Sequence, residues 1–275
     1  TVFFIALFLF FISLASNVFA QTPITTCSQI TQPGEYYLAN DIINSGASAC
    51  INITVDNVIL DCQGHTIDGT DAFRTYGIYV SRSSSTITNI TIKNCVLTDW
   101  YYGLYLYYSN SNTLTNITYN SNSFGLYLYS SGSNTLTNIT ANSNNYGLYL
   151  ESSNSNTLTN ITVNSNGYGL YLYYSNKNTI KDSKFQNNRN YGIYLYTSGS
   201  LANLIYNNLF NNTNNFYFGG TIYANYWNTT KQPGTNIWNS SLGYIGGNYW
   251  TNSSGTGYSD TCKDVNYDGF CDNPY

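Results

Sequence analysis

The sequence predicts an all-β protein, a single-stranded right-handed parallel β-helix built from coils of about 22 residues. Five consecutive segments repeat the same pattern, with a spacing of 22, 22, 22 and then 23 residues. A fixed period in this range is typical of one supersecondary unit stacked many times, because a single unit cannot bury its apolar face alone. No helical period of 3.6 residues persists after residue 20. The segments begin at Gly103, Gly125, Gly147, Gly169 and Gly192.

Residues 103–124 show how one coil is built. They begin with GLYLY, in which leucine and tyrosine alternate, and this alternation predicts a strand with leucines inside and tyrosines outside. The turn cluster SNSN follows. Leu114 and Ile117 are the next inward positions, and their spacing of three predicts a bend at Asn116. Two or three short strands separated by corners, advancing one rung per repeat, describe a parallel β-helix.

Alignment of the coils predicts five interior columns. The columns are Leu104, Leu126, Leu148, Leu170 and Ile193; Leu106, Leu128, Leu150, Leu172 and Leu195; Ile92, Leu114, Leu136, Leu158 and Ile180; Cys95, Ile117, Ile139, Ile161 and Ser183; and Leu97, Tyr119, Ala141, Val163 and Phe185. Stacked apolar side chains of this kind would form one continuous core.

The pattern extends beyond the five repeats and divides the chain into segments. Outside them the period degenerates, and it is lost where Gly, Asn and Trp become frequent. The expected segments are a secretory signal peptide at 1–20, an N-terminal cap and first coil at 21–60, β-helix repeats at 61–218, a terminal coil and cap at 219–250, and a disulfide-closed loop of calcium-binding type at 251–275.

The signal peptide is expected from an apolar run at 2–14 and the small-residue cleavage site VFA before Gln21. The segment starts without Met or a basic region, so we expect it to lack its first residues. We expect the mature chain to be secreted or held at the cell surface, extracellular or periplasmic, without a transmembrane segment.

Charge argues against a nucleic-acid partner. The chain has 9 Lys+Arg against 13 Asp+Glu, a net charge of -4, and its basic residues are scattered. Nucleic-acid binding needs a basic surface.

Six cysteines in a secreted chain favour disulfides. The pairing that we favour joins Cys27 to Cys50, Cys62 to Cys95 and Cys262 to Cys271, out of about 15 possible connectivities. Cys62 and Cys95 fall at nearly equivalent places in neighbouring coils, where free thiols that pack as small apolar residues are the alternative.

A ladder of tyrosines lies between the two columns of inward leucines, so we expect its rings to point outward. Strands about 4.8 Å apart make seven rungs about 29 Å long. An apolar surface of this length is typical of a contact surface, here for glycans or other cell-surface proteins, although tyrosine also stabilises stacked strands as a structural ladder. The ladder is Tyr79, Tyr105, Tyr127, Tyr149, Tyr171, Tyr194 and Tyr217, and a partial second column is Tyr107, Tyr129, Glu151, Tyr173 and Tyr196.

The C-terminal segment DVNYDGFCD predicts a calcium loop. Oxygen-bearing side chains occupy positions 1, 3, 5 and 9 and glycine occupies position 6, as in the first part of an EF-hand loop. Position 12 is Tyr275 rather than Glu, so the loop is closer to the short calcium loops of dockerins or thrombospondin repeats. A polar turn without metal is the alternative. The expected structural Ca²⁺ ligands are Asp264, Asn266, Asp268, the carbonyl of Phe270, and Asp272.

Nine N-x-[ST] motifs are candidate glycosylation sites in a secreted chain. Asn116, Asn138 and Asn160 recur with the repeat, and we expect them to be structural, as left-handed residues that stack in an internal amide ladder. The likelier acceptors are Asn211, Asn228, Asn239 and Asn252.

Nearly all of residues 26–275 resembles the NosD-like or CASH group (carbohydrate-binding proteins and sugar hydrolases) of right-handed β-helix proteins. The matching stretches are VILDCQGHTIDG at 58–69, TYGIYV at 75–80, NITIKNC at 89–95, the GLYL repeats, GGNYW at 246–250 and the C-terminal DVNYDGFCDNPY. The resemblance implies the fold, and it also implies a link to copper delivery or to carbohydrate. A soft-ligand copper site would rest on Cys alone, because the chain has one His and no Met.

Catalysis on this fold would need clustered carboxylates or a basic group on one face. The acidic residues of the regular coils, Asp99, Glu151 and Asp182, occupy three different repeat positions. In the first coils Asp61, His65, Asp68 and Asp71 lie close in sequence. His65 and Asp68 are the candidates for catalysis, but the resemblance places them at a structural turn.

These observations favour a secreted structural or adhesive β-helix module that binds carbohydrate through its tyrosines. A polysaccharide lyase or glycoside hydrolase on the same fold is the second interpretation. A periplasmic copper-handling protein is the third.

Overall fold

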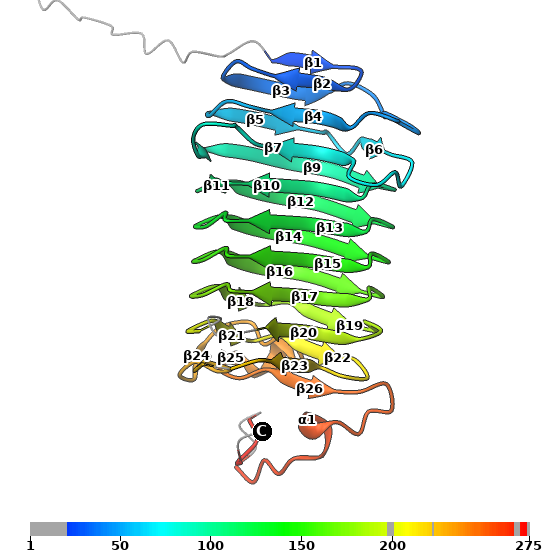
Figure 1. The fold of residues 1–275 in the computed structure, drawn as a ribbon. Helices are drawn as coiled ribbons and strands as arrows, with labels where there is room; N and C mark the ends of the chain where they lie inside the picture. Colours follow the sequence, from blue (N-terminus) through cyan, green and yellow to red (C-terminus); the bar gives the residue numbers. More distant parts are fainter. Residues whose placement is uncertain (1–20, 197–200, 222, 267–269, 274–275) are drawn as a thin grey trace, which may run out of the picture.

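The chain forms a parallel β-helix in which successive coils stack along one axis (Figure 1). The structure, a computed structural model, describes residues 21–196, 201–221, 223–266 and 270–273, so the predicted signal peptide lies outside the described residues. Among these residues, no helix reaches the length and apolarity of a membrane span.

Two long parallel sheets run the length of the stack. The larger, sheet A, contains β1 (Thr22–Ile24), β3 (Gly34–Leu38), β5 (Val58–Asp61), β6 (Thr66–Asp68), β9 (Ile90–Thr98), β12 (Thr113–Asn120), β14 (Thr135–Asn142), β16 (Thr157–Asn164), β18 (Thr179–Lys181), β19 (Lys184–Gln186), β21 (Leu204–Tyr206), β22 (Leu209–Asn211) and β26 (Tyr249–Thr251). Sheet B contains β2 (Ser28–Ile30), β4 (Ala49–Ile53), β7 (Tyr76–Val80), β10 (Tyr102–Tyr107), β13 (Phe124–Tyr129), β15 (Tyr146–Glu151), β17 (Tyr168–Tyr173), β20 (Tyr191–Tyr196) and β23 (Phe216–Gly219).

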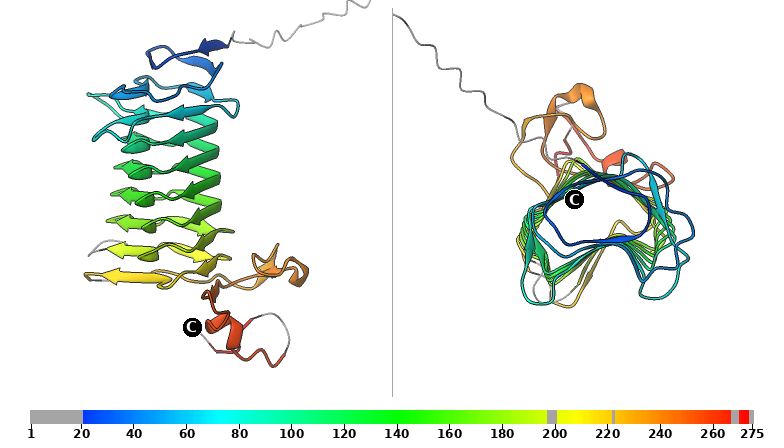
Figure 2. Two further views of the ribbon diagram at one scale, coloured as in Figure 1. Left: turned by 90° about the vertical axis from the view of Figure 1, so that its right-hand side faces the viewer. Right: turned by 90° about the horizontal axis from the view of Figure 1, so that it is seen from above.

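Short elements fill the corners and the C-terminal end. β8 (Ile87–Thr88) pairs with β11 (Ser109–Asn110), and β24 (Gln232–Pro233) pairs antiparallel with β25 (Tyr244–Ile245). A 3₁₀ turn at Ser240–Leu242 and the single-turn helix α1 (Tyr258–Thr261) complete the C-terminal region. Seen along the axis, the coils superimpose, and the region after β23 lies to one side and beyond the last coil (Figure 2).

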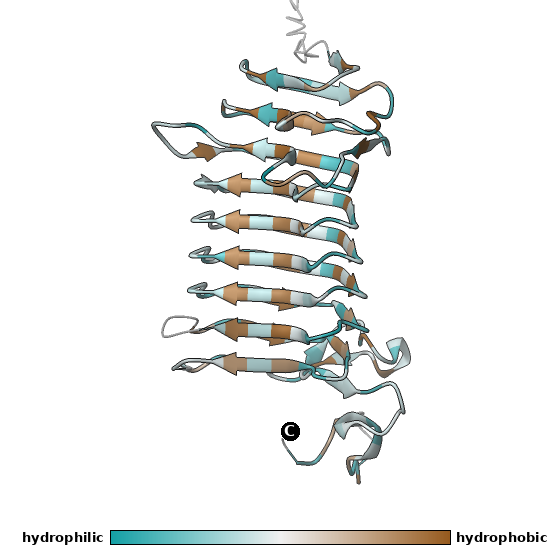
Figure 3. Ribbon diagram, turned by 45° about the vertical axis from the view of Figure 1, so that its right-hand side comes forward, coloured by the Kyte–Doolittle hydropathy of each residue, from teal (hydrophilic) through white to brown (hydrophobic). Residues whose placement is uncertain are grey.

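Register repeats without slippage from coil to coil. Leu104 pairs with Leu126 and Tyr105 with Tyr127, and equivalent positions stay paired through β20, where one extra residue in the preceding turn makes the offset 23 instead of 22. The hydrophobic bands therefore line up along the stack (Figure 3). Every member of the five predicted columns is buried, with at most 1% of its surface exposed, so the predicted core is confirmed.

Glycine is the second residue of six sheet B strands, β7, β10, β13, β15, β17 and β20, because neighbouring coils lie too close there for a side chain. A Cβ on Gly125 would lie 2.6 Å from the carbonyl oxygen of Gly147, and one on Gly147 would lie 2.7 Å from that of Gly169. Any side chain would push the coils apart at these positions.

Buried asparagines close the corners between the sheets. Asn122 donates its backbone N–H (2.9 Å) and its Nδ2 (3.0 Å) to Oδ1 of Asn144 in the next coil, and the same pair of bonds recurs along the ladder. Side-chain amides thereby replace the backbone pairing that is lost at a corner. The two inner ladders are Asn122, Asn144, Asn166, Asn188, Asn212 and Asn215, and Asn112, Asn134, Asn156, Asn178, Asn203 and Asn225.

The ladder predicted at Asn116, Asn138 and Asn160 forms, but it is external rather than internal. All three residues have φ between 54° and 56°, in the left-handed region, as expected. Their side chains are exposed, and Nδ2 of Asn138 donates to Oδ1 of Asn116 at 3.0 Å. The bend points away from the core because Leu114 and Ile117 on either side of Asn116 point into it.

All six cysteines form disulfides, in the pairing favoured from the sequence. Cys27 bonds to Cys50, Cys62 to Cys95 and Cys262 to Cys271. The free-thiol alternative for Cys62 and Cys95 is wrong, because their stacked positions bring the two sulfurs into bonding range.

Candidate functional site

The outer surface of sheet B is covered by three adjacent columns of mainly aromatic side chains, which we call the aromatic face. The central column is the predicted ladder. The trailing column is the predicted partial one, and the leading column was not predicted. The leading column is Tyr76, Tyr102, Phe124, Tyr146, Tyr168 and Tyr191; the central column is Tyr79, Tyr105, Tyr127, Tyr149, Tyr171, Tyr194 and Tyr217; and the trailing column is Tyr107, Tyr129, Glu151, Tyr173 and Tyr196.

The rings of the aromatic face lie outside the core but pack closely on one another. Tyr105 is 9% exposed and Tyr217, at the end of the central column, is 41% exposed. The rings of Tyr105 and Tyr127 are nearly parallel, with an angle of 13° between their planes and 4.7 Å between their centroids. Such stacks cover much of each ring's face, so an incoming ligand meets ring edges, hydroxyls and partial faces.

Burial in this array changes the acidity of the phenols. It raises the pKa of Tyr102 to about 12, and the hydroxyls of Tyr101 and Tyr76 add to the effect. Burial also raises the pKa of Tyr105 and Tyr149. The phenols therefore remain neutral hydrogen-bonding groups at physiological pH.

The central column changes orientation between Tyr127 and Tyr149. Their rings meet edge to face, at 79° with centroids 4.9 Å apart, whereas Tyr149 and Tyr171 are again nearly parallel at 11°. The change occurs beside Glu151, whose Oε2 accepts a short hydrogen bond from the Tyr127 hydroxyl. Burial, together with this bond and the charge of Glu151, raises the pKa of Tyr127.

The predicted catalytic candidates are held by separate structural contacts. Nδ1 of His65 lies 3.0 Å from Oδ1 of Asp41. Oδ2 of Asp68 accepts the backbone N–H of Asn44 at 2.8 Å. Oδ2 of Asp61 lies 3.2 Å from Nζ of Lys93.

Asp68 also lies next to another carboxyl, that of Asp99. Burial, the charge of Asp71 and contacts with Asp68 raise the pKa of Asp99. Within the described ranges, no three His, Cys, Asp or Glu side chains are grouped so as to hold a metal ion.

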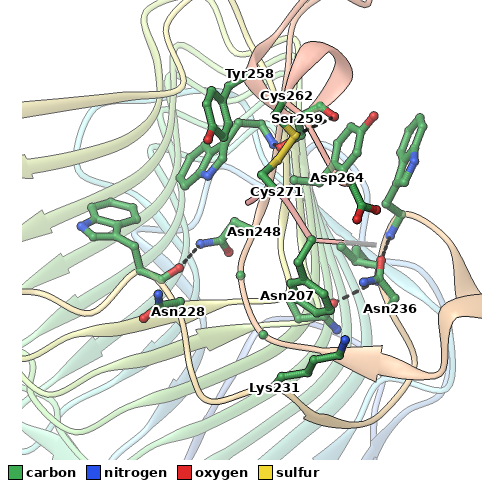
Figure 4. Close-up of a pocket in the computed structure, with 18 of the residues that line it drawn as sticks. Asn207, Asn228, Lys231, Asn236, Asn248, Tyr258, Ser259, Cys262, Asp264 and Cys271 are labelled. Carbon is green, nitrogen blue, oxygen red and sulfur yellow. Dashed lines mark hydrogen bonds between the residues drawn. A yellow bond between two sulfur atoms is a disulfide. The ribbon is translucent and has the colours of Figure 1, made fainter. Parts of the chain in front are cut away.

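A cavity of about 750 Å³ lies between the last coils and the C-terminal region (Figure 4). Its volume is within the range of small-molecule sites. Trp238 stacks on Tyr249 in its wall, with centroids 4.0 Å apart. Asn248 fixes the backbone by donating to the carbonyls of Ile205 and Trp227 at 2.9 and 2.7 Å. The sequence signal for this cavity is that three of the four tryptophans fall within 227–250.

The predicted calcium loop lies beside this cavity, and the Cys262–Cys271 disulfide closes it (Figure 4). Asp264 is half-buried, and Oδ2 of Asp272 accepts the backbone N–H of Val265 at 2.9 Å. Asp268 lies outside the described residues. Calcium binding stays a prediction.

The four predicted glycan acceptors differ in accessibility. Asn228 is exposed. Oδ1 of Asn239 accepts the N–H of Ser241 at 3.0 Å, and Oδ1 of Asn252 accepts that of Ser254 at 3.1 Å. Oδ1 of Asn211 is buried. Their glycosylation stays a prediction.

Stacked parallel coils, three disulfides and an aromatic outer sheet define a parallel β-helix repeat protein. The chain belongs to the NosD family, since the family model described as "Periplasmic copper-binding protein (NosD)" matches residues 49–255. Three disulfides fit an oxidising compartment, extracellular or periplasmic. No curated protein sequence matches the chain.

Similar solved structures include two tailspike proteins and an enzyme module. The enzymatically active domain of tailspike protein 2 from bacteriophage CBA120 has a TM-score of 0.52 at 17% identity, covering 82% of this chain and 46% of that domain. The Dettilon tailspike protein has a TM-score of 0.48 at 14% identity, and the match covers 75% of this chain and 52% of the tailspike. The A-module of a mannuronan C-5 epimerase from Azotobacter vinelandii has a TM-score of 0.39 at 13% identity, and the match covers 74% of this chain and 78% of the module. The chain thus spans about half the length of the first tailspike domain and of the second tailspike. The likeness to tailspike protein 2 concerns the fold alone.

The side chains of this chain do not fit the copper named in the family description. Copper sites use imidazole, thiolate and thioether ligands. All six cysteines are in disulfides, and the chain has no methionine. Its one histidine, His65, lies against Asp41.

Proposed function

We propose that this chain is a carbohydrate-binding β-helix module that works outside the cytoplasm, with the aromatic face as its binding surface. The observation that supports this most directly is the width of the face, which is three side chains across over the five coils that contain β10, β13, β15, β17 and β20. Contiguous apolar surface of this extent on a soluble protein is typical of an interaction site.

Three features favour a glycan over a flat protein partner. The stacked rings present hydroxyls and edges, so the face combines apolar area with hydrogen-bonding groups. The repeat spacing gives equivalent positions along one axis, which suits a polymer of repeating units. The interior of each coil is fully packed, as the 0% exposure of Leu126 and Leu148 illustrates, so the face is held rigidly.

The test replaces three central rings, as Tyr127→Thr, Tyr149→Thr and Tyr171→Thr together, and measures binding on a glycan array. We expect loss of the signals that the unmodified protein gives. The matched control, Tyr223→Thr, Tyr226→Thr and Tyr244→Thr, removes three tyrosines that are 46–57% exposed and lie away from the face. Unchanged glycan binding in the first variant, with circular dichroism showing an intact fold, would refute the proposal.

We also propose that Ca²⁺ binds the C-terminal loop and orders it against the last coil. The support is the spacing of oxygen ligands at 264–272, together with the disulfide that closes the same loop. The ion would have a structural role, away from the aromatic face.

A further inference from the structure

One rung of the aromatic face breaks the trailing column. Tyr129 stacks on Tyr107, with centroids 5.3 Å apart, and Tyr173 stacks on Tyr196 at 5.5 Å. Between them the column holds Glu151, which pairs in register with Tyr129 on one side and Tyr173 on the other. Glu151, which has no ring, therefore separates Tyr129 from Tyr173. Among the described rings of this column, each of these two tyrosines stacks only on the ring that lies on its far side from Glu151.

The spacing of this gap suits a small cation. Tyr129 and Tyr173 are two coils apart, about 10 Å at about 4.8 Å per rung. A cation midway would lie about 5 Å from each ring, within the roughly 6 Å over which a ring attracts a cation. The carboxylate of Glu151 lies at the same rung and supplies the opposite charge.

The charge of Glu151 is not neutralised by a basic side chain of the described residues. Its Oε2 accepts the Tyr127 hydroxyl, and no Lys or Arg of the described residues forms an ion pair with it. Glu151 is also the single charged residue in the nine described strands of sheet B. A half-buried anion among neutral phenols favours a cationic ligand, and with a net charge of -4 the protein repels polyanions.

We propose that Glu151, Tyr129 and Tyr173 bind the protonated amino group of an amino sugar within a polysaccharide. The ammonium donates to the Glu151 carboxylate and lies between the two rings, while the remaining sugar units follow the neighbouring tyrosines along the face. This inference rests on the proposed glycan-binding function and adds a substrate class to it. It also implies discrimination against uronic-acid polymers, which would place carboxylates beside Glu151.

The experiment compares glucosamine hexasaccharide with its fully N-acetylated counterpart by calorimetric titration at pH 6, where amino groups are protonated. The unmodified protein is expected to prefer the free amine by at least about tenfold, because only that ligand adds a charge-assisted bond and a cation–π contact. In Glu151→Gln the preference should vanish while the acetylated ligand binds as before. Glu151→Tyr, which restores the column, should also lose it.

Glu35→Gln is the matched control, since it removes the same charge from the first coils, away from the gap, and it should keep the preference. If both oligosaccharides bind but Glu151→Gln keeps the same preference as the unmodified protein, the amino-sugar site is refuted and the glycan-binding function stands. If neither oligosaccharide binds and the glycan array is also blank, both proposals fall.

Discussion

Asn144 donates two hydrogen bonds to Oδ1 of Asn166 in the next coil, both 2.9 Å long, one from its backbone N–H and one from its Nδ2. Its Nδ2 also donates to the carbonyls of Tyr119 and Asn142 at 3.1 and 3.0 Å. One fully buried amide thus pairs donors and acceptors of three coils. Tyrosines are the most conspicuous residues of the repeats, but these corner amides hold the coils in register.

Replacing this amide should destabilise the stack strongly. Asn144→Ala leaves the buried backbone N–H of Asn122 and the carbonyl of Tyr119 without the Asn144 side chain as partner, whereas Nδ2 of Asn122 keeps the carbonyls of Leu97 and Asn120 as acceptors. Each unpaired buried group costs about 1–3 kcal/mol, so we expect the free energy of unfolding to fall by about 2–4 kcal/mol in urea titrations followed by circular dichroism.

The neighbouring Asn145→Ala is the control, because the Asn145 side chain is exposed. It should change the free energy of unfolding by less than about 0.5 kcal/mol. Equal effects of the two substitutions would show that the ladder does not stabilise the corner.

The fold could be predicted from the sequence because leucines at a fixed period specify both the strand and its inward face. The inner asparagine ladders could not be predicted from the sequence, since Asn is common in every turn. The recurring turn motif NSN does not show which of its side chains points inward. The leading column was missed because Tyr102 and its equivalents precede glycine and read as turn residues. The contact between Tyr127 and Glu151 joins different coils, so only coil-to-coil alignment reveals it.

A substitution at Tyr119, inside the coil, is expected to stabilise the protein rather than to destabilise it. Tyr119 is fully buried above Ala141, and its hydroxyl has no hydrogen-bond partner among the described atoms. Burial raises the pKa of this phenol, which stays neutral. We expect Tyr119→Phe to raise the free energy of unfolding by about 1 kcal/mol, because it removes an unpaired polar group and keeps the ring.

Tyr119→Ala is the companion variant and should cost about 3–5 kcal/mol through the cavity that it leaves. Thermal and urea unfolding measure both. A loss of stability above about 1 kcal/mol in Tyr119→Phe would mean that the hydroxyl is paired in solution.

Lowering the pH should reduce the folding stability of the N-terminal coils, because it protonates the carboxylate of Asp56. Burial alone would raise the pKa of this carboxyl, but hydrogen bonds from the Arg82 guanidinium (2.8 Å) and the Thr88 N–H (2.8 Å) outweigh it and hold the pKa below its usual value. The unfolded chain therefore binds the proton more readily than the folded one. The resulting stability is present above the usual pKa of about 3.9 and is lost as pH falls through the folded pKa.

The measurement is the midpoint of thermal unfolding between about pH 6 and pH 2. Asp56→Asn should lower the midpoint at pH 6 and flatten the acid dependence relative to the unmodified protein. Glu35→Gln removes a carboxylate from the same coils without an ion pair, and it should leave the slope nearly unchanged. Parallel curves for all three proteins would contradict the assignment to Asp56.

Calcium should stabilise the C-terminal region selectively. We expect millimolar Ca²⁺ to bind in calorimetric titrations and to protect the amides of 258–273 from hydrogen exchange, because a bound ion would fix the oxygen ligands around the Cys262–Cys271 loop. Asp264→Ala should abolish both effects, and the repeats between Gly103 and Tyr196 should exchange as before. Mg²⁺ should substitute poorly, since it demands a tighter octahedral shell. If the unmodified protein takes up no Ca²⁺ at millimolar concentration, the loop is a polar turn closed by its disulfide alone.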